Sequence, residues 1–150
     1  MGRVNRRRTI AAPVPEVWRL VSDPHSLPRW WPRTSRVENV ESKSAGRRSQ
    51  WTKVLETAEG RGVRADYRCL SSAENERYVW EQELEGTPFE RHLKELRVEV
   101  GLRAREGGTE VSLTEEQSLK GMSKLGSPLM RRARKDVLDE ALDGIEAALT

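Results

Sequence analysis

Cysteine and histidine are scarce in this chain, and their scarcity excludes several kinds of chemistry. The single cysteine, Cys69, cannot form an internal disulfide, and the two histidines, His25 and His92, lie far apart in the sequence. Zinc sites and iron–sulfur clusters need several such ligands at defined spacings. We therefore expect no bound metal, no cofactor and no disulfide framework.

Long apolar runs are also missing. The N-terminus carries the positive charge of a secretory signal in Arg3, Arg6, Arg7 and Arg8, but the apolar stretch of about 7 to 15 residues that completes such a signal does not follow. No segment has the roughly 20 consecutive apolar residues that a transmembrane helix needs. These absences predict a cytoplasmic protein that does not insert into membranes.

Charge of both signs is abundant, but the excess of one sign is small. The 27 basic and 24 acidic residues leave a formal net charge of +3 at pH 7. No basic segment is interleaved with aromatic residues, which is the pattern of a groove that binds single strands, so we expect no nucleic-acid partner. A chain of 150 residues has the size of one ordinary domain. Residues 1–150 are predicted to form a single domain, as a monomer or a homodimer.

The C-terminal segment, residues 127–149, has the clearest helical pattern. Apolar residues recur there at every fourth position, namely Leu129, Ala133, Val137, Ala141, Ile145 and Leu149. Ser127 and Pro128 are preferred residues at a helix cap and at the first helical position. The pattern predicts one long helix that buries a single face.

Alternation of apolar and polar residues predicts strands before this helix. The segments are 3–12, 35–42, 47–57, 63–71, 76–84, 89–105 and 111–119. Two short helices are predicted between the first and second strands, the second of them from Pro24 to Trp31. A change of parity predicts a bulge near Lys94 or Glu95, and Gly107-Gly108 predicts a two-residue hairpin turn. The fold class is α+β: a curved antiparallel sheet of about seven strands wraps around the C-terminal helix, with the first strand beside the last.

Several short motifs, in this order, resemble the START-like or helix-grip superfamily, also called SRPBCC, and its polyketide cyclase/dehydrase-like branch. They are Ile10-Ala11-Ala12-Pro13, Glu16-Val17-Trp18, Val21-Ser22-Asp23-Pro24, Tyr78-Val79-Trp80, Gly107-Gly108-Thr109-Glu110-Val111 and Ala141-Leu142. The resemblance covers nearly the whole chain. It implies a helix-grip fold with a cavity between the sheet and the long helix, which relatives use for lipids, polyketides and other apolar molecules.

Three hypotheses about function follow from this resemblance, because the superfamily includes enzymes, carriers and chaperone-associated modules. The leading hypothesis is the binding of a small hydrophobic or aromatic molecule, such as a lipid or a polyketide. The second is a polyketide aromatase, cyclase or dehydrase that uses the same cavity. The third is a protein-interaction module like the chaperone activators. The residues leave all three open, and with them the question of catalysis.

Aromatic and polar residues share the predicted inner face of the sheet. The predicted ligand-binding residues are Trp51, Tyr67, Trp80, Gln82 and Arg91. Lys53 lies on the same face, and Tyr67, Arg91 and Lys53 are the candidates for catalysis. A cation there would hold an enolate or carboxylate oxygen, and the phenol would serve as an acid. The alternative interpretations are that these residues fill an ordinary core or that the register is wrong by one residue.

The remaining residues with chemical potential have simpler interpretations. Trp30 and Trp31 are predicted to close one end of the sheet. Cys69 is predicted to be a small buried side chain, and His25 and His92 are predicted to face solvent. The basic cluster of the C-terminal segment has two interpretations, a solvated face or a docking surface for an anionic partner; it comprises Arg131, Arg132, Arg134 and Lys135.

Overall fold

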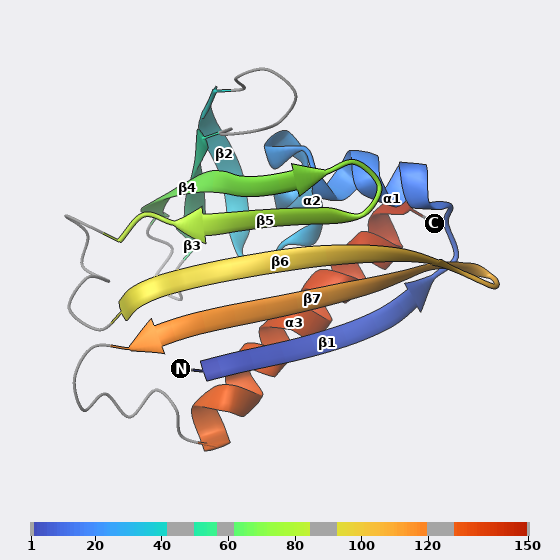
Figure 1. Cartoon of the computed structure of the whole chain (residues 1–150). Helices are drawn as coiled ribbons and strands as arrows, with labels where there is room; N and C mark the ends of the chain where they lie inside the picture. Colours follow the sequence, from blue (N-terminus) through green and yellow to red (C-terminus); the bar gives the residue numbers. More distant parts are fainter. Residues whose placement is uncertain (1, 42–49, 57–61, 85–92, 120–127, 150) are drawn as a thin grey trace.

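The chain folds into a curved antiparallel sheet with one long helix across it. The structure, a computed structural model, describes residues 2–41, 50–56, 62–84, 93–119 and 128–149. Within these residues seven strands are ordered β1-β7-β6-β5-β4-β3-β2 (Figure 1). In chain order the elements are β1 (Gly2–Ile10), α1 (Val14–Val21), the 3-10 helix η1 (Pro24–Ser26), α2 (Leu27–Trp30), β2 (Thr34–Glu41), β3 (Gln50–Glu56), β4 (Gly62–Ala73), β5 (Arg77–Gln82), β6 (Leu93–Arg105), β7 (Gly108–Leu119) and α3 (Pro128–Leu149).

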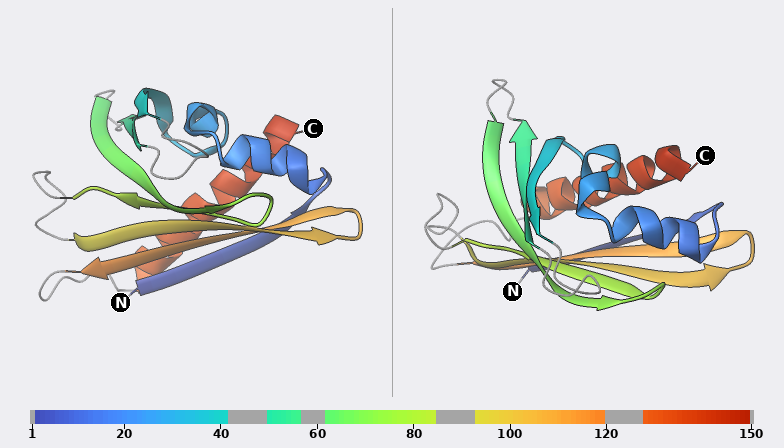
Figure 2. Two further views of the ribbon diagram at one scale, coloured as in Figure 1. Left: turned by 45° about the horizontal axis from the view of Figure 1, so that its top comes forward. Right: turned by 90° about the horizontal axis from the view of Figure 1, so that it is seen from above.

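The position of β1 explains the curvature of the sheet around the helix. Because α1 and α2 separate β1 from β2, β1 pairs with β7 at the opposite edge. Figure 2 shows the sheet bending so that α3 and the short helices lie on its concave side. The buried face of α3 consists of Leu138, Ala141, Leu142 and Ile145. The predicted α+β helix-grip fold, with β1 beside the last strand, is confirmed.

The short helices form where the sequence places caps and prolines. The Asp23 carboxylate accepts a hydrogen bond of 3.0 Å from the backbone N–H of His25, which opens η1 at Pro24. Helix α2 follows directly and buries Leu27 and Trp30. Together, η1 and α2 confirm the second predicted short helix, and they bring Trp30 and Trp31 over the sheet.

The β6–β7 hairpin corrects one detail of the prediction. Arg105 pairs with Gly108, so the two turn residues are Glu106 and Gly107 and not Gly107-Gly108. Gly107 takes a positive φ of 86°, which glycine adopts without steric cost. Gly108 is needed for a different reason, since a Cβ there would overlap the carbonyl oxygen of Ile10. The predicted bulge in β6 is confirmed by a register shift between Leu93 and Glu95.

The acidic half of α3 is neutralised by arginines of β1. The Arg6 guanidinium makes two hydrogen bonds of 2.8 Å to the Asp139 carboxylate, and Arg8 pairs with Asp143. The Arg6 partner lowers the pKa of Asp139. Both arginines have the same parity in β1 as the buried Val4 and Ile10, and they lie on the helix side of this edge strand. None of the helices in the described ranges has the length and apolar character needed to cross a membrane.

A single glycine lets α2 and α3 touch. A Cβ placed on Gly144 of α3 would overlap the carbonyl oxygen of Trp30 and would lie 2.7 Å from its Cα. Backbone atoms cannot rotate away as a flexible side chain can. Because Trp30 belongs to the aromatic cluster on the sheet, this contact sets how closely α2 approaches that cluster.

Gly144→Ala is expected to lower the free energy of unfolding by about 1 to 3 kcal/mol, because the new methyl group overpacks the α2–α3 contact. The higher helix propensity of alanine alone would have the opposite effect and raise the free energy of unfolding by about 1 kcal/mol. Urea unfolding of the variant measures the net effect. Ala147→Gly, at an exposed position of the same helix, is the control and reports propensity without the contact. A stabilised Gly144→Ala variant would show that the helices do not touch here.

Candidate functional site

Four of the five predicted ligand-binding residues lie together on the concave face of the sheet. Trp51 of β3 is paired with Tyr67 of β4, and Tyr67 is paired with Gln82 of β5, so the three side chains form one row across neighbouring strands. Trp80 lies two residues before Gln82 on β5, and all four residues are buried. The fifth, Arg91, lies outside the described residues.

The aromatic rings of this face form a continuous wall. The Trp51 ring stacks on Tyr67 with 6.2 Å between centroids and an interplanar angle of 9°. Trp80 meets Trp51 edge-on at 6.3 Å, and Trp30 and Trp31 meet Trp80 at 6.0 and 5.6 Å. The predicted closing role of Trp30 and Trp31 fits this packing. Edge-to-face contacts of this kind are favourable and hold the rings at fixed angles to one another.

Polar atoms on this face lack partners. The indole N–H groups of Trp30, Trp51 and Trp80 are buried without a hydrogen bond in the described part of the chain. The hydroxyl group of Tyr78, on the same strand as Trp80, is likewise buried without a partner there. Buried polar groups of folded proteins are normally paired, and each unpaired one costs about 1 to 3 kcal/mol. A ligand with acceptor oxygens would supply the partners.

Lys53 is the most unusual residue of the face. Only 2% of its surface is exposed, and its Nζ lies 4.2 Å from the ring centre of Tyr67 and 4.9 Å from that of Trp31. Burial lowers the pKa of Lys53 to about 7, against a smaller opposing effect of the Glu115 carboxylate. Burial also raises the pKa of Tyr67 well above its usual value, and Glu115 adds to this rise. At neutral pH the phenol stays protonated, while much of the amine is neutral.

A buried ion pair next to this group was not predicted. Glu115 of β7 and Arg134 of α3 are 7% and 8% exposed, and Nε of Arg134 donates a 2.8 Å hydrogen bond to Oε1 of Glu115. The Gln117 side-chain amide donates to the same oxygen over 3.0 Å. The interpretation of the basic cluster as a solvated face is therefore wrong for Arg134. The burial of Glu115 could have been predicted from the sequence, because Glu115 continues the inward alternation of Val111 and Leu113.

Two of the other candidate residues, Cys69 and His25, have the burial and exposure that the sequence predicted. Cys69 is buried beside Tyr78, and His25 is exposed, as predicted. His92 lies outside the described residues. Among the residues that are described, no three His, Cys, Asp or Glu side chains lie close enough to hold a metal ion.

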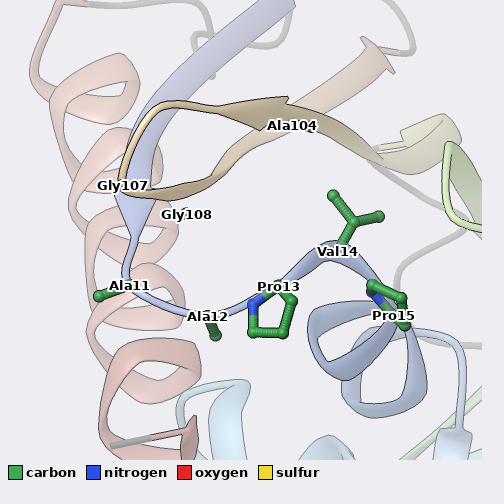
Figure 3. Close-up of a pocket in the computed structure, with 8 residues that line it drawn as sticks. All are labelled: Ala11, Ala12, Pro13, Val14, Pro15, Ala104, Gly107 and Gly108. Atoms are coloured by element: carbon green, nitrogen blue, oxygen red, sulfur yellow. The ribbon is translucent and has the colours of Figure 1, made fainter.

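A separate hollow lies at the other end of the sheet, beside the β6–β7 hairpin. It has a volume of about 610 Å³ and is lined by Ala11, Ala12, Pro13, Val14, Pro15, Ala104, Gly107 and Gly108 (Figure 3). The lining residues carry no polar side-chain atom that would orient a ligand or take part in a reaction. The concave face is the better candidate for function because it combines aromatic walls with buried polar groups.

The curved seven-stranded sheet that holds a long C-terminal helix is a START-like fold. Within this class the chain belongs to the family described as polyketide cyclase/dehydrase and lipid transport, whose model matches residues 1–150. Family and fold together suggest a role in binding hydrophobic ligands. The resemblance inferred from the sequence motifs is confirmed.

Solved structures share this fold over nearly the whole chain. A START superfamily protein from Mycobacterium smegmatis has a TM-score of 0.77 at 16% identity, covering 98% of this chain and 96% of its own. A protein from Thermus thermophilus has a TM-score of 0.71 at 23% identity, covering 99% and 97%. The di-domain ARO/CYC StfQ of the steffimycin biosynthetic pathway has a TM-score of 0.79 at 12% identity, covering 98% of this chain and 50% of its own. No curated protein matches the chain.

Proposed function

We propose that this protein binds a small hydrophobic or aromatic molecule, such as a polyketide or a lipid, in a cavity between the concave face of the sheet and α3. The observation that carries the proposal is the row of Trp51, Tyr67 and Gln82 next to Trp80, where aromatic faces are buried together with the unpaired indole N–H groups of Trp51 and Trp80. Such a mixture is typical of a ligand site and is costly in an ordinary core. Membership of a family that includes polyketide and lipid proteins supports it.

The chemistry of the face favours a planar ligand with oxygen acceptors. The indoles of Trp51 and Trp80 and the phenol of Tyr67 offer donors, and the Gln82 amide offers both a donor and an acceptor. Their rings offer flat surfaces for stacking. A hydroxylated or ketonic aromatic molecule satisfies both requirements, whereas a plain hydrocarbon would leave the donors unpaired. Native mass spectrometry of freshly purified protein, followed by solvent extraction, would identify a ligand that is retained on purification.

2-Naphthol, a planar molecule with one hydroxyl group, is expected to quench the fluorescence of the buried tryptophans on binding. Tyr67→Phe and Gln82→Leu should each weaken its affinity about five- to tenfold, which corresponds to one lost hydrogen bond of about 1 kcal/mol. Glu81→Gln is the control, because it alters the neighbouring residue of the same strand, whose carboxylate pairs with Arg68 on the opposite face. Unchanged affinity in both test variants would place the ligand elsewhere.

A second candidate function is catalysis of the aromatase, cyclase or dehydrase type in the same cavity. Lys53 favours it, since a buried amine with a pKa of about 7 can accept a proton from an acidic carbon of a poly-ketone at neutral pH. The protonated Tyr67 phenol would stabilise the resulting enolate oxygen. Turnover of a ketide whose pH–rate profile has an inflection near 7 that Lys53→Met abolishes would support it. A flat profile, or no turnover, would count against it.

A further inference from the structure

The amine of Lys53 is enclosed by aromatic faces instead of oxygen atoms. Its Nζ lies over the rings of Tyr67 and Trp31. Lysine ammonium groups in proteins normally have carboxylate or carbonyl partners. The nearest carboxylate that acts on it, Glu115, is already bound by Arg134 and Gln117.

This environment favours the neutral amine. Burial removes the water that would stabilise the ammonium form, and it lowers the pKa of Lys53 to about 7. At pH 7 about half of such a group carries a free lone pair, against roughly one in three thousand for a lysine at the ordinary pKa of 10.5. A desolvated lysine of this kind is a nucleophile toward carbonyl carbon. An anchor for a carboxylate would have to stay protonated, which burial opposes by more than the cation–π contacts with Tyr67 and Trp31 offset.

We propose that Lys53 forms an imine with aldehyde or ketone ligands that enter the site. The inference rests on the proposed function and adds the chemical class of the ligand, a planar molecule with a reactive carbonyl group. The nitrogen lone pair attacks the carbonyl carbon, the C–N bond forms, and the C=O electron pair moves to oxygen, which takes up a proton. Loss of a proton from nitrogen and of water from carbon then gives the C=N bond, with no net oxidation or reduction.

Tyr67 is placed to assist this step. Its ring lies 4.2 Å from the reacting nitrogen, and its phenol stays protonated because burial raises its pKa. A protonated phenol beside the amine can donate to the carbonyl oxygen as negative charge develops on it. Lys53 and Tyr67 come from adjacent strands, β3 and β4, so the sheet itself holds their spacing.

The test traps the imine with 2-naphthaldehyde and sodium cyanoborohydride, which reduces it to a stable secondary amine. Peptide mapping of the intact protein at pH 7 is expected to find Lys53 modified at least roughly tenfold faster than Lys135, a half-buried lysine of α3. Lys53→Arg and Lys53→Met should remove that adduct, whereas Lys135→Arg should leave it unchanged. Two Lys53 variants are used so that a folding defect in one does not decide the result. Modification of Lys53 no faster than of Lys135 would overturn the proposal.

The rate of trapping should also depend on pH with a midpoint near 7. In the described part of the chain the groups that face Lys53 are Tyr67 on β4 and Glu115 on β7, with Arg134 on α3 bound to Glu115. The Tyr67 phenol is not expected to produce a midpoint there, because burial raises its pKa well above the usual value. A midpoint near 10 would show an ordinary lysine and would overturn the inference.

A parallel titration separates this inference from the proposed function. 2-Naphthol has the same ring system but no carbonyl group, so it reports binding without imine formation. If 2-naphthol binds in a Tyr67-dependent manner and no adduct forms at Lys53, the carbonyl inference fails while the proposed function stands. If neither probe binds, both fail.

Discussion

Replacing Lys53 by methionine is expected to raise the free energy of unfolding at pH 7 by about 4 to 5 kcal/mol. The pKa of the amine falls from 10.5 to about 7 on folding, and each unit of such a shift corresponds to about 1.4 kcal/mol. Methionine keeps the length and most of the volume of the buried side chain but has no charge to desolvate. A gain of this size is large for a single substitution, since most substitutions destabilise.

The same shift in the pKa of Lys53 determines how the free energy of unfolding depends on pH. Between the folded pKa of about 7 and the unfolded value of 10.5, the unfolded chain binds a proton that the folded chain does not bind. The free energy of unfolding of the natural protein should therefore rise from pH 7 to pH 9, by roughly 2 kcal/mol from this group. Below about pH 7 both states bind the proton, and the penalty is constant. In Lys53→Met the rise should disappear.

Urea unfolding of both proteins at pH 6, 7 and 9 measures these effects. Lys135→Met is the control because it removes a lysine from the helix surface and leaves Lys53 in place. Its stability should differ little from that of the natural protein at any of the three pH values. A Lys53→Met protein that is less stable than the natural one at pH 7, or a natural protein whose stability is flat over this range, would contradict the burial of a titrating amine.

The stability that Lys53→Met is expected to gain is an argument for a functional role of Lys53. Natural proteins keep residues that lower stability where activity or binding requires them, and strongly shifted pKa values gather at such sites. Lys53 stands between Trp51 and Leu55 on β3, where a leucine or methionine would fill the same space without a charge to desolvate. Its position beside Tyr67 and on the same strand as the unpaired indole N–H of Trp51 supports a ligand site on this face.

Local periodicity was sufficient to predict this face of the sheet. In β3, β4 and β5 the side chains alternate with a period of two, so the apolar neighbours of Lys53, Tyr67 and Gln82 determined that these polar residues point inward. The structure buries all three. The same rule placed Trp80 and Cys69 correctly, because a strand that is buried on one face leaves little freedom in register.

Contacts between distant elements could not be predicted in this way. Arg6 and Asp139 are 133 residues apart, and which arginine meets which carboxylate depends on the angle at which α3 crosses β1. The contact of Gly144 with Trp30 depends on the same docking. Arg134 lies four residues before Leu138 and eight before Leu142, so the helical period places it on the buried face of α3, but the period does not show that Glu115 is its partner.

Arg134→Met is expected to lower the free energy of unfolding by about 3 to 5 kcal/mol. The substitution leaves the Glu115 carboxylate buried without its charged partner, and removing one member of a buried ion pair costs about this much. It also removes the hydrogen bonds of Arg134 to the carbonyl oxygens of Gly2 and Glu115, which join α3 to β1 and β7. Urea unfolding at pH 7 measures the loss.

Two further variants separate charge from packing in this result. Arg132→Met removes an exposed arginine from the same turn of α3 and should change stability by no more than about 0.5 kcal/mol. The double variant Arg134→Met with Glu115→Leu removes both charges and should recover most of the loss, because an apolar pair of similar volume often replaces a buried ion pair at little cost. A double variant as unstable as Arg134→Met would show that the hydrogen bonds to β1 and β7 matter more than the unpaired carboxylate. Recovery would show instead that the ion pair contributes little net stability, and its role would then be the charge that Glu115 sets beside Lys53 and Tyr67.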